Sequence, residues 1–146
     1  MKQVRAKKAK MRVTKKERDC LIKVKENGDG SFPVRLCEVA KLMGVRPPSV
    51  LELVERLQGK GLLKSRSGMI RLTAQGQREY ERIMLNHRVF ESLYVQSGIS
   101  ADDACREIEA FDYFLDNSNA EAILKKIGNP SVCPHGKPIR SRAGGG

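Results

Sequence analysis

The side chains best suited to chemistry lie in the second half of the chain, in the stretch ACREIEAFDYFL, residues 104–115. This stretch contains Cys105, Glu109 and Asp112, at successive spacings of four and three residues. In a helix, that spacing places the three side chains within roughly 60° of arc, at the margin of the apolar stripe that faces the core. A thiol and two carboxylates on one face predict a site for a divalent metal ion.

A second pair of candidate ligands precedes this stretch. The segment HRVFE places His87 and Glu91 four residues apart, and therefore on one face of a helix. Each pattern alone has a plain alternative: a surface histidine beside a glutamate, or a solvent-facing stripe with a half-buried cysteine. Together, on adjacent predicted helices of one acidic segment, the two patterns favour a metal site.

The net charge of +11 is distributed unevenly along the chain. Residues 1–18 carry nine basic side chains and one acidic one, whereas residues 84–136 carry four basic and eight acidic ones. The basic front half suits a polyanionic partner and the acidic segment suits a cation, although a solvated charge bias would give the same composition. No apolar run is long enough to span a membrane and no apolar block opens the chain, so we expect a cytoplasmic protein without a membrane partner.

The four cysteines are widely separated and follow no disulfide pattern, so we expect reduced thiols or metal ligands. Cys20 and Cys37 lie in apolar helical contexts and are predicted to be small core residues. Cys133 and His135 lie in the segment CPHG, where Pro134 and Gly136 indicate a fixed turn, so we leave both out of the predicted metal site.

The order of the predicted elements indicates a mainly α protein. A basic arm over residues 1–12 is expected to stay unfolded. The predicted elements that follow are helices over about 14–26, 33–45 and 46–61, a β-hairpin over 62–72, and helices over about 73–96, 104–115 and 119–127. Three helices and a hairpin make a winged helix-turn-helix domain, predicted over residues 13–74. A helical domain is predicted over 75–139, before a flexible tail over 140–146.

A helix that enters the major groove reads base edges with residues near its N-terminus, while basic groups around it contact phosphates. On the third helix, the candidate DNA-binding residues are Arg46, Pro48, Ser49, Leu51 and Glu52. In the hairpin, Lys64, Arg66 and Arg71 are spaced to reach the DNA backbone or minor groove. The alternatives are that Pro48 only starts the helix and that Glu52 is a solvated surface residue.

The chain resembles the diphtheria-toxin-repressor-like (DtxR/MntR) family of metal-dependent transcriptional regulators over about Val13 to Ile139. The matching stretches are GVRPPSVLELVERLQGKGLL, RLTAQGQREYERIMLNHRVFESL, DDACREIE and IGNPSVCPHGKPI. The resemblance implies a winged DNA-binding domain and a helical dimerisation and metal-binding domain. It also implies a homodimer that binds double-stranded operator DNA when Mn(II) or Fe(II) is bound. The SH3-like third domain of some members is expected to be absent.

The resemblance also assigns ligands by position. The first-helix ligand of the family falls on Asp19, whereas its second acidic position falls on Ile22, which cannot bind a metal. The family's HRxxE ligands fall on His87 and Glu91. Zn(II) remains open beside Mn(II) and Fe(II), because Cys and His are good zinc ligands.

The family's next motif, a Cys or Glu followed after two residues by Glu-His, allows two registers. One begins at Cys105 and leaves Ile108 and Glu109 in the Glu-His positions. The other begins at Glu109 and places Asp112 and Tyr113 there, with Cys105 as an upstream ligand. We prefer the second register because it needs no insertion before the terminal motif, although Tyr113 then replaces the expected His.

We therefore expect a homodimeric, metal-responsive transcriptional regulator, in the role of a repressor of metal-uptake genes. The predicted ligands are Asp19, His87, Glu91, Cys105, Glu109 and Asp112. The alternative is a winged-helix regulator that is metal-independent or that responds to oxidation of the Cys105 thiol, which Ile22 and Tyr113 favour. An enzyme has little support, because two histidines and no paired nucleophile and base are present.

Overall fold

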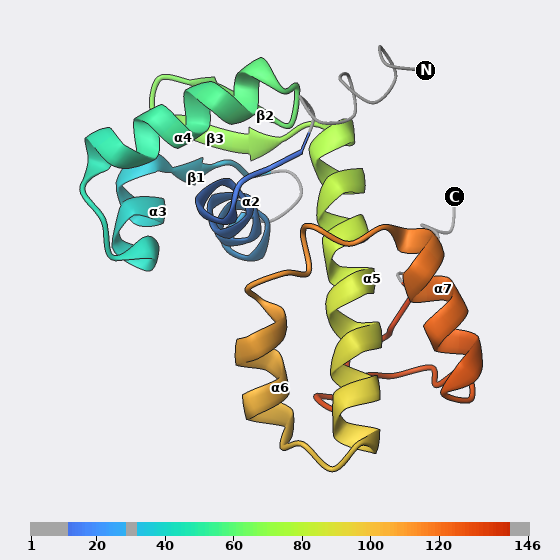
Figure 1. Cartoon of the computed structure of the whole chain (residues 1–146). Helices are drawn as coiled ribbons and strands as arrows, with labels where there is room; N and C mark the ends of the chain where they lie inside the picture. The colour runs from blue at the N-terminus through green and yellow to red at the C-terminus, as the bar shows by residue number, and fades with distance from the viewer. Residues whose placement is uncertain (1–11, 29–31, 141–146) are drawn as a thin grey trace. The chain divides into compact units, whose positions relative to one another are not determined.

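The computed structural model of the protein describes residues 12–28 and 32–140 (Figure 1). The chain divides into two compact units, Met1–Tyr80 and Glu81–Gly146. The predicted basic arm, apart from residue 12, and the predicted tail, apart from residue 140, lie outside the described residues. No helix in the described ranges is both long enough and apolar enough to cross a membrane.

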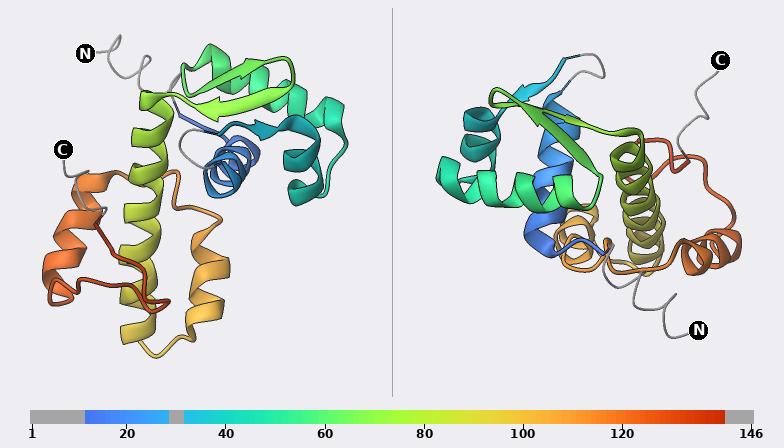
Figure 2. Two further views of the ribbon diagram at one scale, coloured as in Figure 1. Left: turned by 180° about the vertical axis from the view of Figure 1, so that it is seen from behind. Right: turned by 90° about the horizontal axis from the view of Figure 1, so that it is seen from above.

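The first unit is a winged helix-turn-helix. Its elements are α2 (Lys15–Asn27), β1 (Val34–Arg35), α3 (Leu36–Met43), α4 (Pro47–Gly59), β2 (Leu63–Arg66), β3 (Met69–Leu72) and the first turns of α5 (Ala74–Gln96). The strands form an antiparallel sheet in the order β1-β3-β2, and the hairpin of β2 and β3 lies beside α4 (Figures 1 and 2). The predicted fold class is therefore confirmed.

The second helix is shorter than the predicted 33–45. Val34 and Arg35 pair with β3 instead, because Val34 gains a buried position opposite Ile70 and its backbone joins the sheet. The helix α3 then ends at Gly44, whose φ of 66° lies in the left-handed region that glycine adopts without strain. At the tip of the hairpin, Ser67 and Gly68 both have positive φ, as a tight hairpin turn requires.

Charged groups inside the first unit are paired. Thr14 caps α2, and its hydroxyl and the Glu17 side chain form a reciprocal capping box. Glu17 is buried and accepts a hydrogen bond from Lys60, which also donates to the carbonyl of Arg12. An unpaired buried carboxylate would be destabilising, so Glu17 requires the contact with Lys60. This contact also links the start of α2 to the end of α4.

Of the two cysteines predicted to be core residues, one is correctly placed. Cys20 is fully buried, and this burial, reinforced by Glu17 and Asp19, raises its pKa to about 12. Its thiol is therefore inert at neutral pH. Cys37, in contrast, is exposed, so that prediction was wrong. Its short helix buries only Val39 and Ala40, and Cys37 falls outside this face.

The second unit packs two short helices against the rest of α5. The helices α6 (Ala101–Ile108) and α7 (Asn117–Lys126) flank this part of α5 on opposite sides (Figures 1 and 2). A buried cluster joins α5, α7 and the terminal segment, and its members are Val89, Ala120, Leu124, Cys133 and Ile139. The terminal segment thus completes the core of this unit.

The sequence predicted a single helix over residues 104–115, and this prediction was wrong. The helix α6 ends at Ile108, and turns follow it. The turns are held by α5: Arg82 donates to the carbonyls of Tyr113 and Leu115. Asn86 donates to the carbonyls of Asp112 and Leu115. These side chains satisfy carbonyl groups that a longer helix would have satisfied internally.

The start of α5 depends on a glycine. Thr73 accepts a hydrogen bond from the Gly76 amide and donates to the carbonyl of Gly61, so the helix begins directly against the chain before β2. A Cβ atom at Gly76 would lie 2.0 Å from the carbonyl oxygen of Leu62. Only glycine fits this approach, since the Leu62 atoms that a Cβ would meet belong to the backbone and cannot turn away.

We expect Gly76→Ala to lower the free energy of unfolding by about 1–3 kcal/mol, because the backbone must shift to accept the methyl group. Gly59→Ala is the matched control, since a Cβ there meets nothing within 4 Å. Urea denaturation should find Gly59→Ala neutral or up to about 1 kcal/mol more stable. Equal effects of the two variants would show that the approach to Leu62 is unimportant.

Candidate metal centre and nucleic-acid interface

The centre of the candidate metal site is His87 on α5. Its ring is buried, and Nδ1 lies 3.0 Å from the Oδ2 atom of the fully buried Asp112. A carboxylate can only accept, so this contact favours the tautomer with its proton on Nδ1. The other ring nitrogen, Nε2, lies 3.4 Å from the Sγ atom of Cys105 on α6. His87 is therefore oriented from one side and directed at a thiol on the other.

A second histidine joins the site through Glu91. This carboxylate is buried, one helical turn after His87, and its Oε2 atom lies 3.7 Å from His87 Nε2. Its Oε1 atom accepts a hydrogen bond from Nδ1 of His135, which comes from the terminal segment. Nε2 of His135 lies 3.5 Å from Asp102 at the start of α6. The hydrogen bond to Glu91, and then the charges of Glu91 and Asp102, raise the pKa of His135.

The residues present fit a divalent transition metal. Imidazole, thiolate and carboxylate are the donors that such ions take. With metal–ligand bonds of about 2.0–2.3 Å, ligand atoms of one ion lie about 3–4 Å apart, and the contacts of His87 Nε2 with Cys105 and Glu91 fall in this range. The donors form a chain of pairs instead of a closed cage, and among the described residues no three such side chains are already arranged around an ion.

Four of the six predicted ligands lie close to one another in the structure. His87, Glu91, Cys105 and Asp112 are brought together. Glu109, the cap residue after α6, is half-buried, and within residues 12–28 and 32–140 its side chain has no hydrogen bond or ion pair. Its helical stripe with Cys105 and Asp112 is interrupted because α6 ends at Ile108.

Asp19 lies in the first unit, on α2. Its carboxylate accepts hydrogen bonds from Lys15 at 2.6 and 2.8 Å and from Arg18 at 3.0 Å. The first unit therefore supplies this carboxylate with two cationic partners of its own. Ile22, which occupies the second acidic position of the family, is buried among the apolar residues of α2.

His135 is the donor that sequence reasoning missed. The CPHG segment is a turn, as predicted: the Cys133 amide donates to the carbonyl of Lys137, and the Gly136 amide to that of Cys133. This turn buries Cys133 in the core and directs His135 toward Glu91. The available signal was a histidine near an acidic segment. The direction of the His135 side chain, however, depends on how the terminal segment packs against α5 and α7, which are distant in the sequence.

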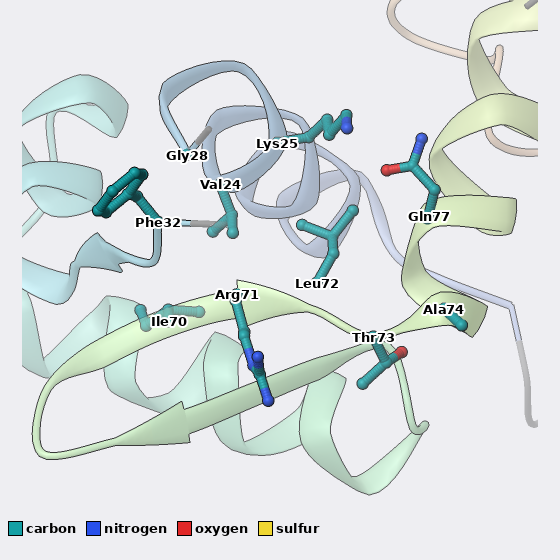
Figure 3. A pocket seen from close by; sticks show the side chains of 10 residues that line it. All are labelled: Val24, Lys25, Gly28, Phe32, Ile70, Arg71, Leu72, Thr73, Ala74 and Gln77. Atoms are coloured by element: carbon teal, nitrogen blue, oxygen red, sulfur yellow. The ribbon is translucent and has the colours of Figure 1, made fainter. Parts of the chain in front are cut away.

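The hollow drawn in Figure 3 is not a rival metal centre. It lies within the first unit and has a volume of about 260 Å³. Val24, Ile70 and Leu72 supply apolar surface, and Lys25 and Gln77 supply polar groups. None of its lining residues is a histidine, cysteine or carboxylate, so it lacks metal ligands.

The predicted DNA-binding residues of α4 lie on its exposed surface. They are Arg46, Pro48, Ser49, Leu51 and Glu52, while the opposite face of α4 is buried. Arg46 is the N-cap residue of α4 and provides no side-chain cap. Pro47 and Pro48 have no amide hydrogen. The amides of Ser49 and Val50 donate to the carbonyl of Arg46, so the start of this helix leaves no free amide. Glu52 lies 3.7 Å from Arg56, an exposed pair of little energetic consequence.

The predicted wing residues Lys64, Arg66 and Arg71 are exposed as well. None of the three has an ion-pair partner in the parts of the chain that the structure describes. Together with α4, they give the first unit a cationic surface without neutralising acids at the wing. These features define a winged-helix protein with a candidate metal centre in a second, helical unit.

Comparisons with known proteins agree with this architecture. Residues 73–141 match the family described as iron dependent repressor, metal binding and dimerisation domain. A hypothetical protein from Sulfolobus solfataricus, known from a crystal structure, is 31% identical with a TM-score of 0.77, and the match covers 88% of this chain and 100% of that one. The chain belongs to the diphtheria-toxin-repressor-like (DtxR/MntR) family.

Curated relatives are longer than this chain. An HTH-type transcriptional regulator of Aeropyrum pernix, itself uncharacterized, is 33% identical over 112 residues, or 75% of this chain and 62% of that protein. The iron-dependent repressor IdeR of Mycobacterium leprae is 26% identical over 113 residues, or 76% of this chain and 49% of that protein. The match thus spans 62% of the first of these relatives and about half of the second.

We expect Asp112→Asn to weaken Mn(II) binding about 10- to 100-fold, because the amide no longer fixes the proton on His87 Nδ1. Asp103→Asn is the matched control, since Asp103 is exposed on α6 and, among the described residues, its side chain pairs only with Ser100 and Arg106. Calorimetric titration gives the affinities, and circular dichroism checks the fold. A folded Asp112→Asn protein with unchanged affinity would contradict the orienting role of this carboxylate.

Proposed function

We propose that this protein is a dimeric, DNA-binding transcriptional regulator, a repressor whose binding to operator DNA depends on Mn(II) or Fe(II). The observation that carries the metal dependence is the buried contact of His87 with Asp112 on one nitrogen and Cys105 on the other. A histidine held in this way presents one lone pair in a fixed direction. Membership of a family with a metal-binding and dimerisation domain supports both the ion and the dimer.

The proposed ligands within the second unit are His87, Glu91 and Cys105, with His135 as a further donor. Asp112 is better suited to orient His87 than to bind the ion, since its carboxylate faces Nδ1. A bound divalent ion would supply the positive charge that neutralises these acidic donors. Cys105 must lose its proton to bind, and His135 must release Glu91, so affinity falls as the pH is lowered. Zn(II) also suits this donor set.

Glu109 and Asp19 stay predictions in this scheme. Glu109 would need to turn toward the site from its half-exposed position. Asp19 would need to leave Lys15 and Arg18, whose hydrogen bonds it accepts in the first unit. Either movement would contribute to regulation only if the ion bound the DNA-binding conformation more tightly than the conformation of the DNA-free protein. Regulation requires that the ion has different affinities for the two states.

For the DNA, we propose that α4 enters the major groove. Its exposed N-terminal half places Arg46 near a phosphate or a guanine edge, and Pro48 and Leu51 near thymine methyl groups. Ser49 and Glu52 would add polar contacts to phosphate and base edges. The exposed positions of these side chains and the buried opposite face support this orientation.

The test is DNA affinity with and without metal. An operator is first selected from random duplexes by the metal-loaded protein, and its affinity is then measured under reductant with Mn(II), Fe(II), Zn(II) or chelator. We expect the activating ion to strengthen binding about 5- to 150-fold, the usual size of an allosteric coupling. His87→Ala should bind equally with and without metal. Equal affinities of the wild-type protein in all conditions would refute metal regulation.

A thiol-responsive regulator is the second candidate, favoured by one contact. Cys105 is half-buried within hydrogen-bond reach of His87 Nε2, an arrangement that can activate a thiol. Hydrogen peroxide would then change operator affinity in metal-free wild-type protein and leave Cys105→Ser unaffected. A peroxide response without a metal response would replace the metal proposal by this one.

We expect Arg46→Gln to weaken operator binding by about 1–3 kcal/mol if Arg46 contacts a guanine. Binding to an unrelated duplex should fall less, since non-specific binding depends on phosphates. Lys16→Gln, an exposed change on α2, is the charge-matched control. Fluorescence anisotropy with both duplexes measures the effects. Full operator affinity of Arg46→Gln would remove Arg46 from the interface.

A further inference from the structure

Asn86 lies in the middle of α5, directly before His87, and is fully buried. Asparagine has a lower helix propensity than alanine or leucine, and a buried amide is destabilising unless its polar groups are paired. Within the described parts of the chain, the Oδ1 atom of Asn86 has no hydrogen-bond partner. Both features disfavour asparagine at this position. The advantage of this residue therefore lies in the N–H donors of its amide.

The amide nitrogen of Asn86 contacts the turns that follow α6. Its Nδ2 atom donates to the carbonyl of Asp112 at 2.9 Å and to the carbonyl of Leu115 at 3.0 Å. The carboxylate of the same Asp112 lies 3.0 Å from Nδ1 of His87. Asp112 is thus attached to α5 at two points, by its backbone to Asn86 and by its side chain to the next residue. This double attachment restricts the direction of the carboxylate.

Arg82 holds the same turns at neighbouring carbonyl groups. It lies one helical turn before Asn86 and donates to the carbonyls of Tyr113 and Leu115, each at 2.8 Å. Arg82 thus fixes the chain beyond Asp112, whereas Asn86 also holds the residue whose carboxylate contacts His87. The two side chains allow a comparison between a general support of the turns and a direct hold on Asp112.

We propose that Asn86 is a positioning residue of the candidate metal centre. Its amide fixes the backbone of Asp112, and the carboxylate of Asp112 then holds the ring proton of His87 on Nδ1. The lone pair of Nε2, which lies 3.4 Å from the thiol of Cys105, is thereby left for an ion. This inference rests on the proposed metal-binding function and adds to it a residue that does not contact the ion.

The first test observes the ring of His87 by nuclear magnetic resonance in chelator-treated, full-length protein. The chain has two histidines, so labelling with nitrogen-15 histidine gives two rings, and His135→Gln assigns them. At mildly alkaline pH, we expect the Nδ1–H tautomer of His87 in the wild-type protein. Asn86→Leu should give a mixture of tautomers, because Asp112 is no longer fixed. The control, Arg82→Gln, should keep the wild-type tautomer.

The second test measures the affinity for Mn(II) by calorimetric titration. Asn86→Leu should bind about 10-fold more weakly than the wild-type protein, at the lower end of the losses seen for partners outside the ligands. Because Asn86 acts through Asp112, adding Asn86→Leu to Asp112→Asn should weaken binding no further. A residue that only supports the fold would give independent losses that add. Arg82→Gln should stay close to the wild-type affinity.

Circular dichroism and urea denaturation check that each variant is folded. If Asn86→Leu does not fold, Asn86→Ala takes its place in both tests, because alanine removes the amide and has the highest helix propensity. The spectra of His87 need no metal, so they report the orientation of the ring separately from the affinity.

The outcomes separate this inference from the proposed function. An unchanged tautomer or an unchanged Mn(II) affinity in a folded Asn86 variant would refute the positioning role while metal binding stands. Additive losses with Asp112→Asn, or an equal effect of Arg82→Gln, would refute it as well, because the turns would then need only general support. If wild-type protein binds none of Mn(II), Fe(II) and Zn(II), the proposed metal dependence and this inference are refuted together.

Discussion

The contact between His87 and Asp112 is the constraint on which the second unit depends. Both side chains are buried, and a buried imidazole or carboxylate is costly unless it is hydrogen-bonded. To bring Asp112 to the ring, the chain must leave the helix after Ile108, and Arg82 and Asn86 receive the carbonyl groups that this exit exposes. One polar requirement thus determines where α6 ends and where the thiol of Cys105 lies.

A second polar contact of the site joins Glu91 and His135. Glu91 is buried, and His135 donates a hydrogen bond to it, with its pKa raised by this contact. A protonated imidazole and a divalent cation can each neutralise a buried carboxylate. The terminal segment that carries His135 also completes the apolar core through Cys133, so its turn serves packing and electrostatics together.

The two units use charge in opposite ways. In the first, Glu17 and Lys60 pair inside, whereas the wing leaves Lys64 and Arg71 opposed without acids in the described chain. In the second, carboxylates are gathered around histidines and a thiol. The buried pair of Glu17 and Lys60 stabilises the fold. The repulsion between the wing cations and the clustering of carboxylates are destabilising, and a bound phosphate or cation can offset them. Each unit is thus prepared for a ligand of the opposite sign.

The sequence by itself determined the elements and the kinds of ligand. Caps, turn residues and local periodicity predict the winged helix-turn-helix and the pair of His87 and Glu91, because these signals act over a few residues. Tertiary structure alone decided which donors meet. Periodicity assigned Glu109 to the stripe of Cys105, but side chains of α5 end that helix early, and a distant turn brings His135 instead. Contacts between residues far apart in the chain depend on packing, which no local pattern contains.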